Sequence, residues 1–88
     1  MCDDEAGEVP LANVFRVLRA WRVGASQDPE NPGAYLLVKG KVAESKTLPE
    51  CVSREMLHYL QRKFGIWIHH FYHPEMMAVQ IPPSDKPN

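Results

Sequence analysis

The chain has little of what covalent cross-linking or catalysis would need. It has two cysteines, Cys2 and Cys51, in 88 residues, too few for the disulfide framework that stabilises many small secreted proteins. Its five glycines are isolated, so no glycine-rich phosphate-binding loop is indicated. No serine has the context of a nucleophile elbow, and no pair of carboxylates stands out. We therefore expect a protein that is not an enzyme and holds no cofactor.

Long apolar runs are also missing. No stretch approaches the roughly 18–20 apolar residues of a membrane span, and no apolar signal segment follows Met1. The sequence therefore predicts a cytoplasmic protein in a reducing compartment. Cys51 would lie in the first turn of a helix, where the dipole lowers a thiol pKa. A catalytic thiol also needs a positioned base, and a buried, inert cysteine is the more common case.

A strong charge of either sign is absent as well, because the net charge is −1. Four acidic residues are the only charged ones in the first nine positions: Asp3, Asp4, Glu5 and Glu8. The remainder has ten Lys and Arg against seven acidic residues. This body is only mildly basic, well below what a dedicated nucleic-acid binder carries.

The length allows one domain with one core. Residues 1–9 are expected to be a disordered acidic lead-in, and residues 82–88, with three prolines, a disordered tail. A single domain is therefore predicted for residues 10–81.

Residues 11–23 fit two structures. As a helix, they place apolar side chains at i, i+3, i+4 and i+7, with Pro10 at the start and Gly24 after the end. As a strand, their Val, Phe and Trp content is typical. A ten-residue loop, 24–33, then leads to a strong strand at 34–43, and a hairpin would pair the two. We favour the strand slightly.

The rest of the chain is easier to assign. Thr47 and Glu50 form a capping-box pattern before an amphipathic helix that ends at Gly65. Residues 66–72 and 76–81 are predicted to be strands joined by a turn at 73–75. The expected fold is a two-layer α+β domain, an antiparallel sheet in the order β-β-α-β-β with one covering helix. The alternative order is α-β-α-β-β.

Three of the four histidines, His69, His70 and His73, lie close together and could bind a metal ion. In a strand, however, His69 and His73 would lie about 13 Å apart, too far to share one ion. We therefore predict no metal site. A His-based metal or redox protein that also uses Cys51 is the third hypothesis, and a pH-sensitive interface role is also open because histidine titrates near neutrality.

Basic residues suggest a second hypothesis. If the two first elements form a hairpin, cations from both strands could share the exposed sheet face with a tyrosine. Such a surface can bind single-stranded nucleic acid. Its residues would be Arg16, Arg22, Tyr35, Lys39 and Lys41. A solvated face that discourages edge pairing is the more common use of such residues.

The leading hypothesis comes from the aromatic segment 66–72. Read as a strand, it is apolar on both faces, and one helix can cover only one of them. The second layer would be a partner protein, a second copy of the chain, or residues 10–23 folded as a helix. We predict a small cytoplasmic protein-binding module: an adaptor, inhibitor or complex subunit. Its interface residues would be Trp67, His69, Phe71, His73 and Met76.

Overall fold

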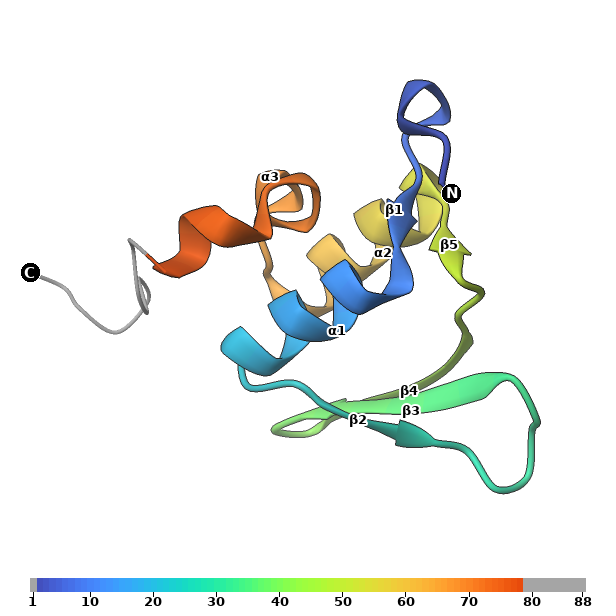
Figure 1. Ribbon diagram of the computed structural model, residues 1–88. Coiled ribbons are helices and arrows are strands. Elements are labelled where there is room, and N and C mark those ends of the chain that lie inside the picture. Colours follow the sequence, from blue (N-terminus) through green and yellow to red (C-terminus); the bar gives the residue numbers. More distant parts are fainter. Residues whose placement is uncertain (1, 79–88) are drawn as a thin grey trace, which may run out of the picture.

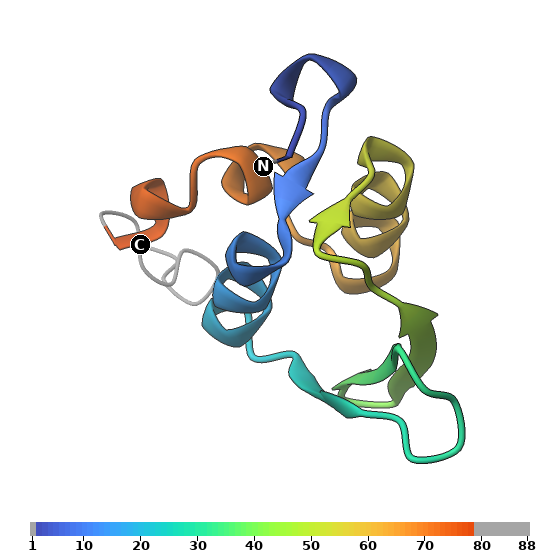
Figure 2. The same ribbon diagram turned by 45° about the vertical axis from the view of Figure 1, so that its right-hand side comes forward.

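The computed structural model describes residues 2–78, which form an α+β domain (Figure 1). Within this range one sheet has the order β2-β3-β4 and a second, two-stranded sheet pairs β1 with β5. Helices α1 and α2 lie on one side of the larger sheet, and α3 contacts both helices (Figures 1 and 2). The predicted α+β class with antiparallel pairing is confirmed, but several elements differ from their predicted type.

The larger sheet consists of β2 (Gly24–Gln27), β3 (Ala34–Lys39) and β4 (Val42–Thr47). The predicted strand at 34–43 is therefore two strands joined by the two-residue turn Gly40–Lys41. Gly40 has φ +61, the conformation that a type II′ hairpin turn requires at its first central position. Sequence reading missed this hairpin because a single Gly between two lysines resembles an interruption within one strand.

Alternate residues of β3 face the helices. Leu37 is completely buried on this inner face, and Tyr35 shares the face because side chains alternate along a strand. The Tyr35 ring meets the edge of Phe15 from α1, with the ring centroids 5.1 Å apart. On β4, Glu44 accepts a 2.7 Å hydrogen bond from the hydroxyl of Tyr59 in α2. These contacts attach α1 to the central strand β3 and α2 to the edge strand β4.

Residues 11–20 form helix α1 (Leu11–Ala20), so the preferred strand assignment for 11–23 is wrong. The helical spacing prevails because Val14, Val17 and Leu18 fall on one face and are all completely buried. A strand would place Val17 and Leu18 on opposite faces. Tertiary burial therefore overrides the strand propensity of Val and Phe.

Helix α1 ends in a Schellman motif in which Arg22, with φ +66, takes the left-handed position. The N–H of Val23 donates to the carbonyl of Leu18 at 2.8 Å, and the N–H of Arg22 donates to that of Arg19 at 3.0 Å. Val23 and Leu18 are both in the core. The predicted stop at Gly24 is therefore two residues late, and a side chain occupies a position that favours glycine.

The helix α2 (Arg54–Phe64) begins six residues later than its predicted capping box indicates. Its N-cap is Ser53, whose Oγ accepts from the N–H of Met56, and Gly65 ends it as predicted, with φ +73. The residues before it form the short strand β5 (Cys51–Val52), paired with β1 (Val9–Pro10). This pairing prevents an earlier helix start.

The aromatic segment is not a strand. Residues 68–72 form the short helix α3 (Ile68–Tyr72), followed by the 3-10 helix η2 (Pro74–Ala78) where the turn and the next strand were predicted. Ile66 and Phe71 are completely buried, because α1 and α2 both pack on this segment. The second covering layer is therefore α1, and residues 79–81 of the predicted last strand, like the tail at 82–88, lie outside the described residues.

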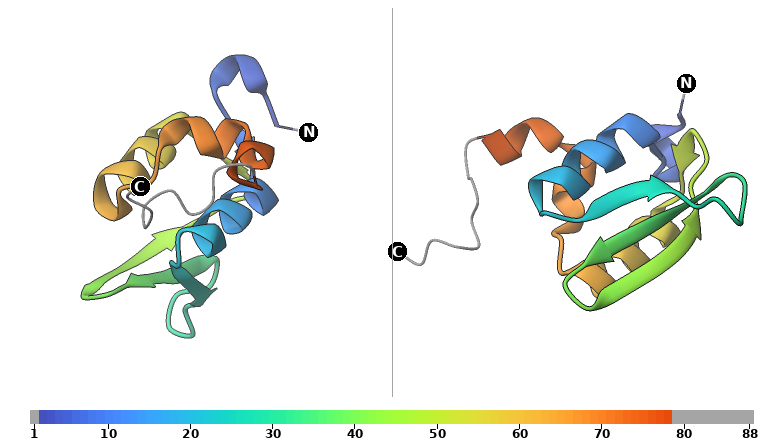
Figure 3. Two further views of the ribbon diagram at one scale, coloured as in Figure 1. Left: turned by 90° about the vertical axis from the view of Figure 1, so that its left-hand side faces the viewer. Right: turned by 90° about the horizontal axis from the view of Figure 1, so that it is seen from below.

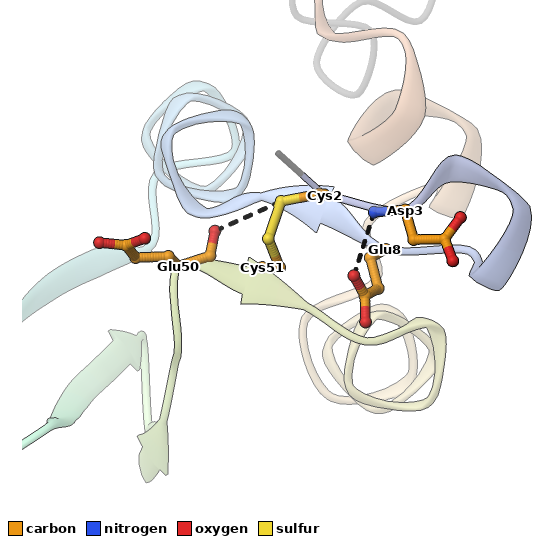
Figure 4. The surroundings of a disulfide bond; sticks show 5 residues. All are labelled: Cys2, Asp3, Glu8, Glu50 and Cys51. Atoms are coloured by element: carbon orange, nitrogen blue, oxygen red, sulfur yellow. Dashed lines mark hydrogen bonds between the residues drawn. A yellow bond between two sulfur atoms is a disulfide. The ribbon is translucent and has the colours of Figure 1, made fainter.

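The N-terminal segment is joined to the body, contrary to the prediction of a disordered lead-in. After the 3-10 helix η1 (Asp4–Ala6), β1 pairs with β5, and the side chain of Val9 is buried. A disulfide links Cys2 to Cys51, with the two Cα atoms 5.3 Å apart (Figure 4). The carbonyl of Gly7 also accepts a 2.7 Å hydrogen bond from the hydroxyl of Tyr72.

The disulfide removes the two roles considered for Cys51, catalysis and metal binding. Cys51 has no thiol for catalysis or metal binding while the bond is intact. The pairing could not be read from the spacing, since 49 positions separate the cysteines and the lead-in was assigned no structure. Within residues 2–78, none of the helices has the length and apolar character needed to cross a membrane.

Replacing Arg22 with glycine should stabilise the protein. A left-handed backbone costs a residue with a Cβ about 1–2 kcal/mol, and glycine avoids this cost but loses more conformational entropy on folding. The expected net gain in the free energy of unfolding is up to about 1 kcal/mol, measured by chemical denaturation. Arg16→Gly, inside α1, should destabilise by about 1 kcal/mol. A loss of stability in Arg22→Gly would contradict the strained conformation.

Reduction of the disulfide should lower stability substantially. Closing a loop of this size removes chain entropy from the unfolded state worth about 4 kcal/mol, and the bond also holds β1 beside β5. The melting temperature should fall when reductant is added to the wild type. A Cys2→Ser, Cys51→Ser double variant should melt at the lower temperature with or without reductant. Equal melting of oxidised and reduced wild type would contradict this account.

Candidate protein-interaction surface

The helical form of residues 68–72 changes the arrangement of the histidines. One helical turn separates His69 from His73, and their ring centroids lie only 4.7 Å apart. His70 projects from a different side of the helix and is 2% exposed. The 13 Å separation expected for a strand is therefore wrong, and the two exposed imidazoles form an adjacent pair.

His70 contacts two tryptophan rings. Its ring is stacked on that of Trp67, with centroids 5.7 Å apart and planes inclined by 24°. The ring of Trp21 is tilted against it, with centroids 6.0 Å apart. Trp21 follows α1 and Trp67 precedes α3, so these contacts join two helices far apart in the sequence.

The environment of His70 favours its neutral form. Burial lowers the pKa of His70, and the charge of neighbouring His69 lowers it further. The Nδ1 atom of His70 has no hydrogen-bond partner among the described residues. A proton on this buried ring would add a charge without a compensating hydrogen-bond acceptor at Nδ1.

Trp67 is the largest exposed apolar side chain of this region, with 58% of its surface accessible, and Met76 is 41% accessible. The pair His69 and His73 lies on the same segment and is exposed. We call these four residues, Trp67, His69, His73 and Met76, the Trp67 surface. The buried His70 ring contacts both Trp67 and Trp21, and the ammonium of Lys39 lies 5.7 Å from the centroid of the Trp21 ring.

Phe71 does not belong to this surface. It was predicted to share an exposed face with Trp67 because residues i and i+4 of a strand point the same way. The structure buries it completely in the core. Trp67 lies outside the helix as its N-cap residue, whereas Phe71 projects from the inner side.

The His69–His73 pair does not amount to a complete metal centre. Within residues 2–78, no group of three or more His, Cys, Asp or Glu side chains is placed to hold a metal ion. The nearest acidic group is Glu75, whose carboxylate lies 3.8 Å from Nδ1 of His73. The hypothesis that joined His69, His70, His73 and Cys51 loses His70 to burial and Cys51 to the disulfide.

The five residues of the nucleic-acid hypothesis do not share one face. Tyr35 and Lys39 lie on the inner, helix-facing side of β3, and Arg16 is on α1. Arg22 and Lys41 lie in separate turns. The outer face of the sheet has small or apolar side chains such as Leu36, Val38 and Ser45, and no cation within its three strands. The basic sheet face was predicted from a hairpin that does not form.

The contact of Trp21 with His70, and that of Lys39 with Trp21, were not predicted from the sequence. Trp21 was assigned to a strand, which gave no reason to place it near His70. A signal was present, since Trp21 ends the apolar helical stripe of residues 11–21 and so had to meet another buried element.

The chain matches none of the family models, curated proteins or solved structures with which it was compared.

The buried histidine predicts an acid sensitivity. Because the folded protein holds the pKa of His70 below its usual value near 6.5, the unfolded chain binds this proton more readily. The free energy of unfolding should therefore be highest above pH 6.5 and fall as the pH decreases toward the folded pKa. Denaturant titrations between pH 5 and 8 measure this slope.

Two variants test whether the slope belongs to His70. His70→Phe keeps an aromatic ring but cannot bind a proton, so its stability should depend less on pH across this range. His58→Gln removes an exposed histidine of α2 and should retain the slope of the wild type. A slope that survives in His70→Phe would contradict the assignment.

Proposed function

We propose that this protein is a small, non-catalytic protein-binding module, an adaptor, inhibitor or complex subunit, whose partner binds the Trp67 surface. The observation that carries the proposal is the state of Trp67. Its indole is 58% exposed and yet is stacked on a buried ring. An exposed tryptophan held in one orientation loses little entropy on binding, which is why rigid aromatic residues dominate protein interfaces.

The neighbours of Trp67 suit the same role. Met76 offers a flexible, polarisable apolar side chain that adapts to a partner. His69 and His73 can donate or accept hydrogen bonds at the rim of an apolar patch.

As a strand that is apolar on both faces, residues 66–72 would have needed a second covering layer, either a partner or residues 10–23 folded as a helix. Helix α1 supplies that layer, so only the exposed part of the segment supports an interface. This narrows the proposed contact to Trp67, His69, His73 and Met76, without Phe71.

The nucleic-acid hypothesis has weaker support. Lys39 is the one of its cations that has a cation–π contact with Trp21, next to this surface, among the described residues. Neutralising the phosphates of a nucleic-acid strand requires several cations in one groove. A metal-dependent role has a two-imidazole pair and no third protein ligand within the described chain. Both are less well supported than protein binding.

The cytoplasmic location is still a prediction. Disulfides persist in oxidising compartments and are rare in a reducing cytosol, so the Cys2–Cys51 bond favours an oxidising location. Thiol alkylation in intact cells before lysis distinguishes the two. Alkylation of both Cys2 and Cys51 would show reduced thiols and support a cytoplasmic location. An intact disulfide would argue against that location.

Substitution of Trp67 should test the proposed interface. The wild type is used as bait in its native cell extract, each captured protein is purified, and its affinity is measured directly. Trp67→Ala should weaken binding at least tenfold, because truncating such an anchor costs about 2 kcal/mol or more. Val38→Ala is the matched control, since Val38 is also exposed, at 43%, but lies on the outer sheet face.

Two results would contradict the proposal. One is that Trp67→Ala binds every captured partner as tightly as the wild type does. The other is that Val38→Ala weakens binding to the same extent. Sedimentation over a concentration series separately reports self-association, and a dimer that Trp67→Ala dissolves would identify a second copy of the chain as the partner.

A further inference from the structure

The edge strand β2 borders a hollow that is separate from the Trp67 surface. The hollow has a volume of about 430 Å³, and all four residues of β2 line it. Its other walls are Phe15 and Arg19 of α1, Val23, and Tyr35 of β3. Seen from below, β2 lies between α1 and β3 (Figure 3). Helix α1 lies between β2 and α3 (Figure 1).

The register identifies the backbone groups that face the hollow side of β2. In an antiparallel pair, residues alternate between hydrogen-bonded and non-hydrogen-bonded positions. The N–H of Asp28 donates to the carbonyl of Ala34, so the hydrogen-bonded pairs along β2 are Ser26 with Leu36 and Gly24 with Val38. The N–H and C=O groups of Ala25 and Gln27 therefore point away from β3, toward the free edge.

The β2 edge lacks the features that usually prevent edge pairing. Proteins protect such strands with charged side chains, prolines or bulges, whereas β2 reads Gly-Ala-Ser-Gln and is exposed throughout. The opposite edge is different, because β4 has Glu44 and Lys46 on its inner side. The carboxylate of Glu44 also accepts a hydrogen bond from Tyr59 and pairs with Lys63.

The walls of the hollow define the chemistry of a ligand. Phe15 and Tyr35 meet edge to face and form an aromatic floor beside Val23. Arg19 is exposed at the rim, one turn after Phe15, and within residues 2–78 it has no ion-pair partner. A ligand that fits has a strand-like backbone, an apolar side chain facing the aromatic rings and a carboxylate near Arg19.

We propose that the hollow is a peptide-binding groove in which an extended acidic segment of another protein pairs with β2 as an added antiparallel or parallel strand. The backbone groups of Ala25 and Gln27 supply the main-chain hydrogen bonds. The Phe15–Tyr35 floor takes an apolar side chain, and Arg19 pairs with a carboxylate. This binding site is independent of the Trp67 surface, and its failure would leave the proposed function untouched.

A random octapeptide library displayed on phage is the probe, selected against the oxidised full chain. The selected peptides should share an acidic residue and alternate apolar positions. Their affinities are then measured as synthetic peptides. N-methylation of alternate backbone nitrogens should abolish binding, because it removes the donors that pair with the strand.

Matched variants locate the site. Ala25→Pro removes an N–H that faces the free edge and leaves the hydrogen bonds to β3 in place, so it should weaken binding at least tenfold. Ala43→Pro is the control. Ala43 is also an exposed alanine whose N–H faces away from β3, at the opposite edge, and its substitution should leave affinity unchanged. Arg19→Glu should weaken binding at least tenfold, whereas Arg16→Glu, on another side of α1, should change it little.

A direct measurement covers the case in which Ala25→Pro does not fold. In the wild type, the amide protons of Ala25 and Gln27 should be slowed in hydrogen exchange when peptide is added, and those of Ala43 and Ser45 should not. The proposal is overturned if the library yields no binder, if binding is equally sensitive to Ala43→Pro, or if the two β2 amides stay unprotected. Sedimentation that shows edge-to-edge dimers in place of peptide binding would also overturn it, since the occupant would then be a second copy.

Discussion

Burial of the apolar face of helix α1 is the constraint on which the rest of the structure depends. Val14, Val17 and Leu18 are completely removed from water, and the helix contacts the sheet region through β2 and the C-terminal helices through α3. Burial of three such side chains contributes several kcal/mol in total, at about 1.5–3 kcal/mol each. Because α1 contacts both β2 and α3, it also fixes how the sheet and the C-terminal helices are placed relative to each other.

The elements that were predicted correctly are those whose own sequence pattern is clear, and the others depend on contacts with distant parts of the chain. Helix α2 has a clear amphipathic pattern and a glycine stop at Gly65, and it was found, although its start was placed too early. The α+β class followed from the alternation of patterns. Residues 11–20 and 66–72 were assigned wrongly because both are rich in strand-forming residues, and a short element takes its form from its neighbours more than from its own propensity.

The candidate surface was predictable only in part. Trp67, His69, Phe71, His73 and Met76 were grouped as one face or edge of a predicted sheet, and the structure leaves all of them but Phe71 accessible. Phe71 could not be distinguished from Trp67 without knowing that the segment is helical. The joining of Trp21, His70 and Trp67 depends on long-range packing, and so does the Cys2–Cys51 bond. A single sequence contains no direct signal for contacts of this kind.

The two proposed binding sites are linked through α1 by geometry. One side of α1 contributes Phe15 and Arg19 to the groove beside β2, and its C-terminal end leads into Trp21, which contacts His70 beneath the Trp67 surface. The Schellman motif at Arg22 lies between these two regions, because it follows Trp21 directly and leads the chain into the edge strand β2. The end of one helix therefore lies beside both regions, the exposed edge strand β2 and the aromatic contact of Trp21 with His70, and the two proposed binding sites depend on the same short stretch of chain.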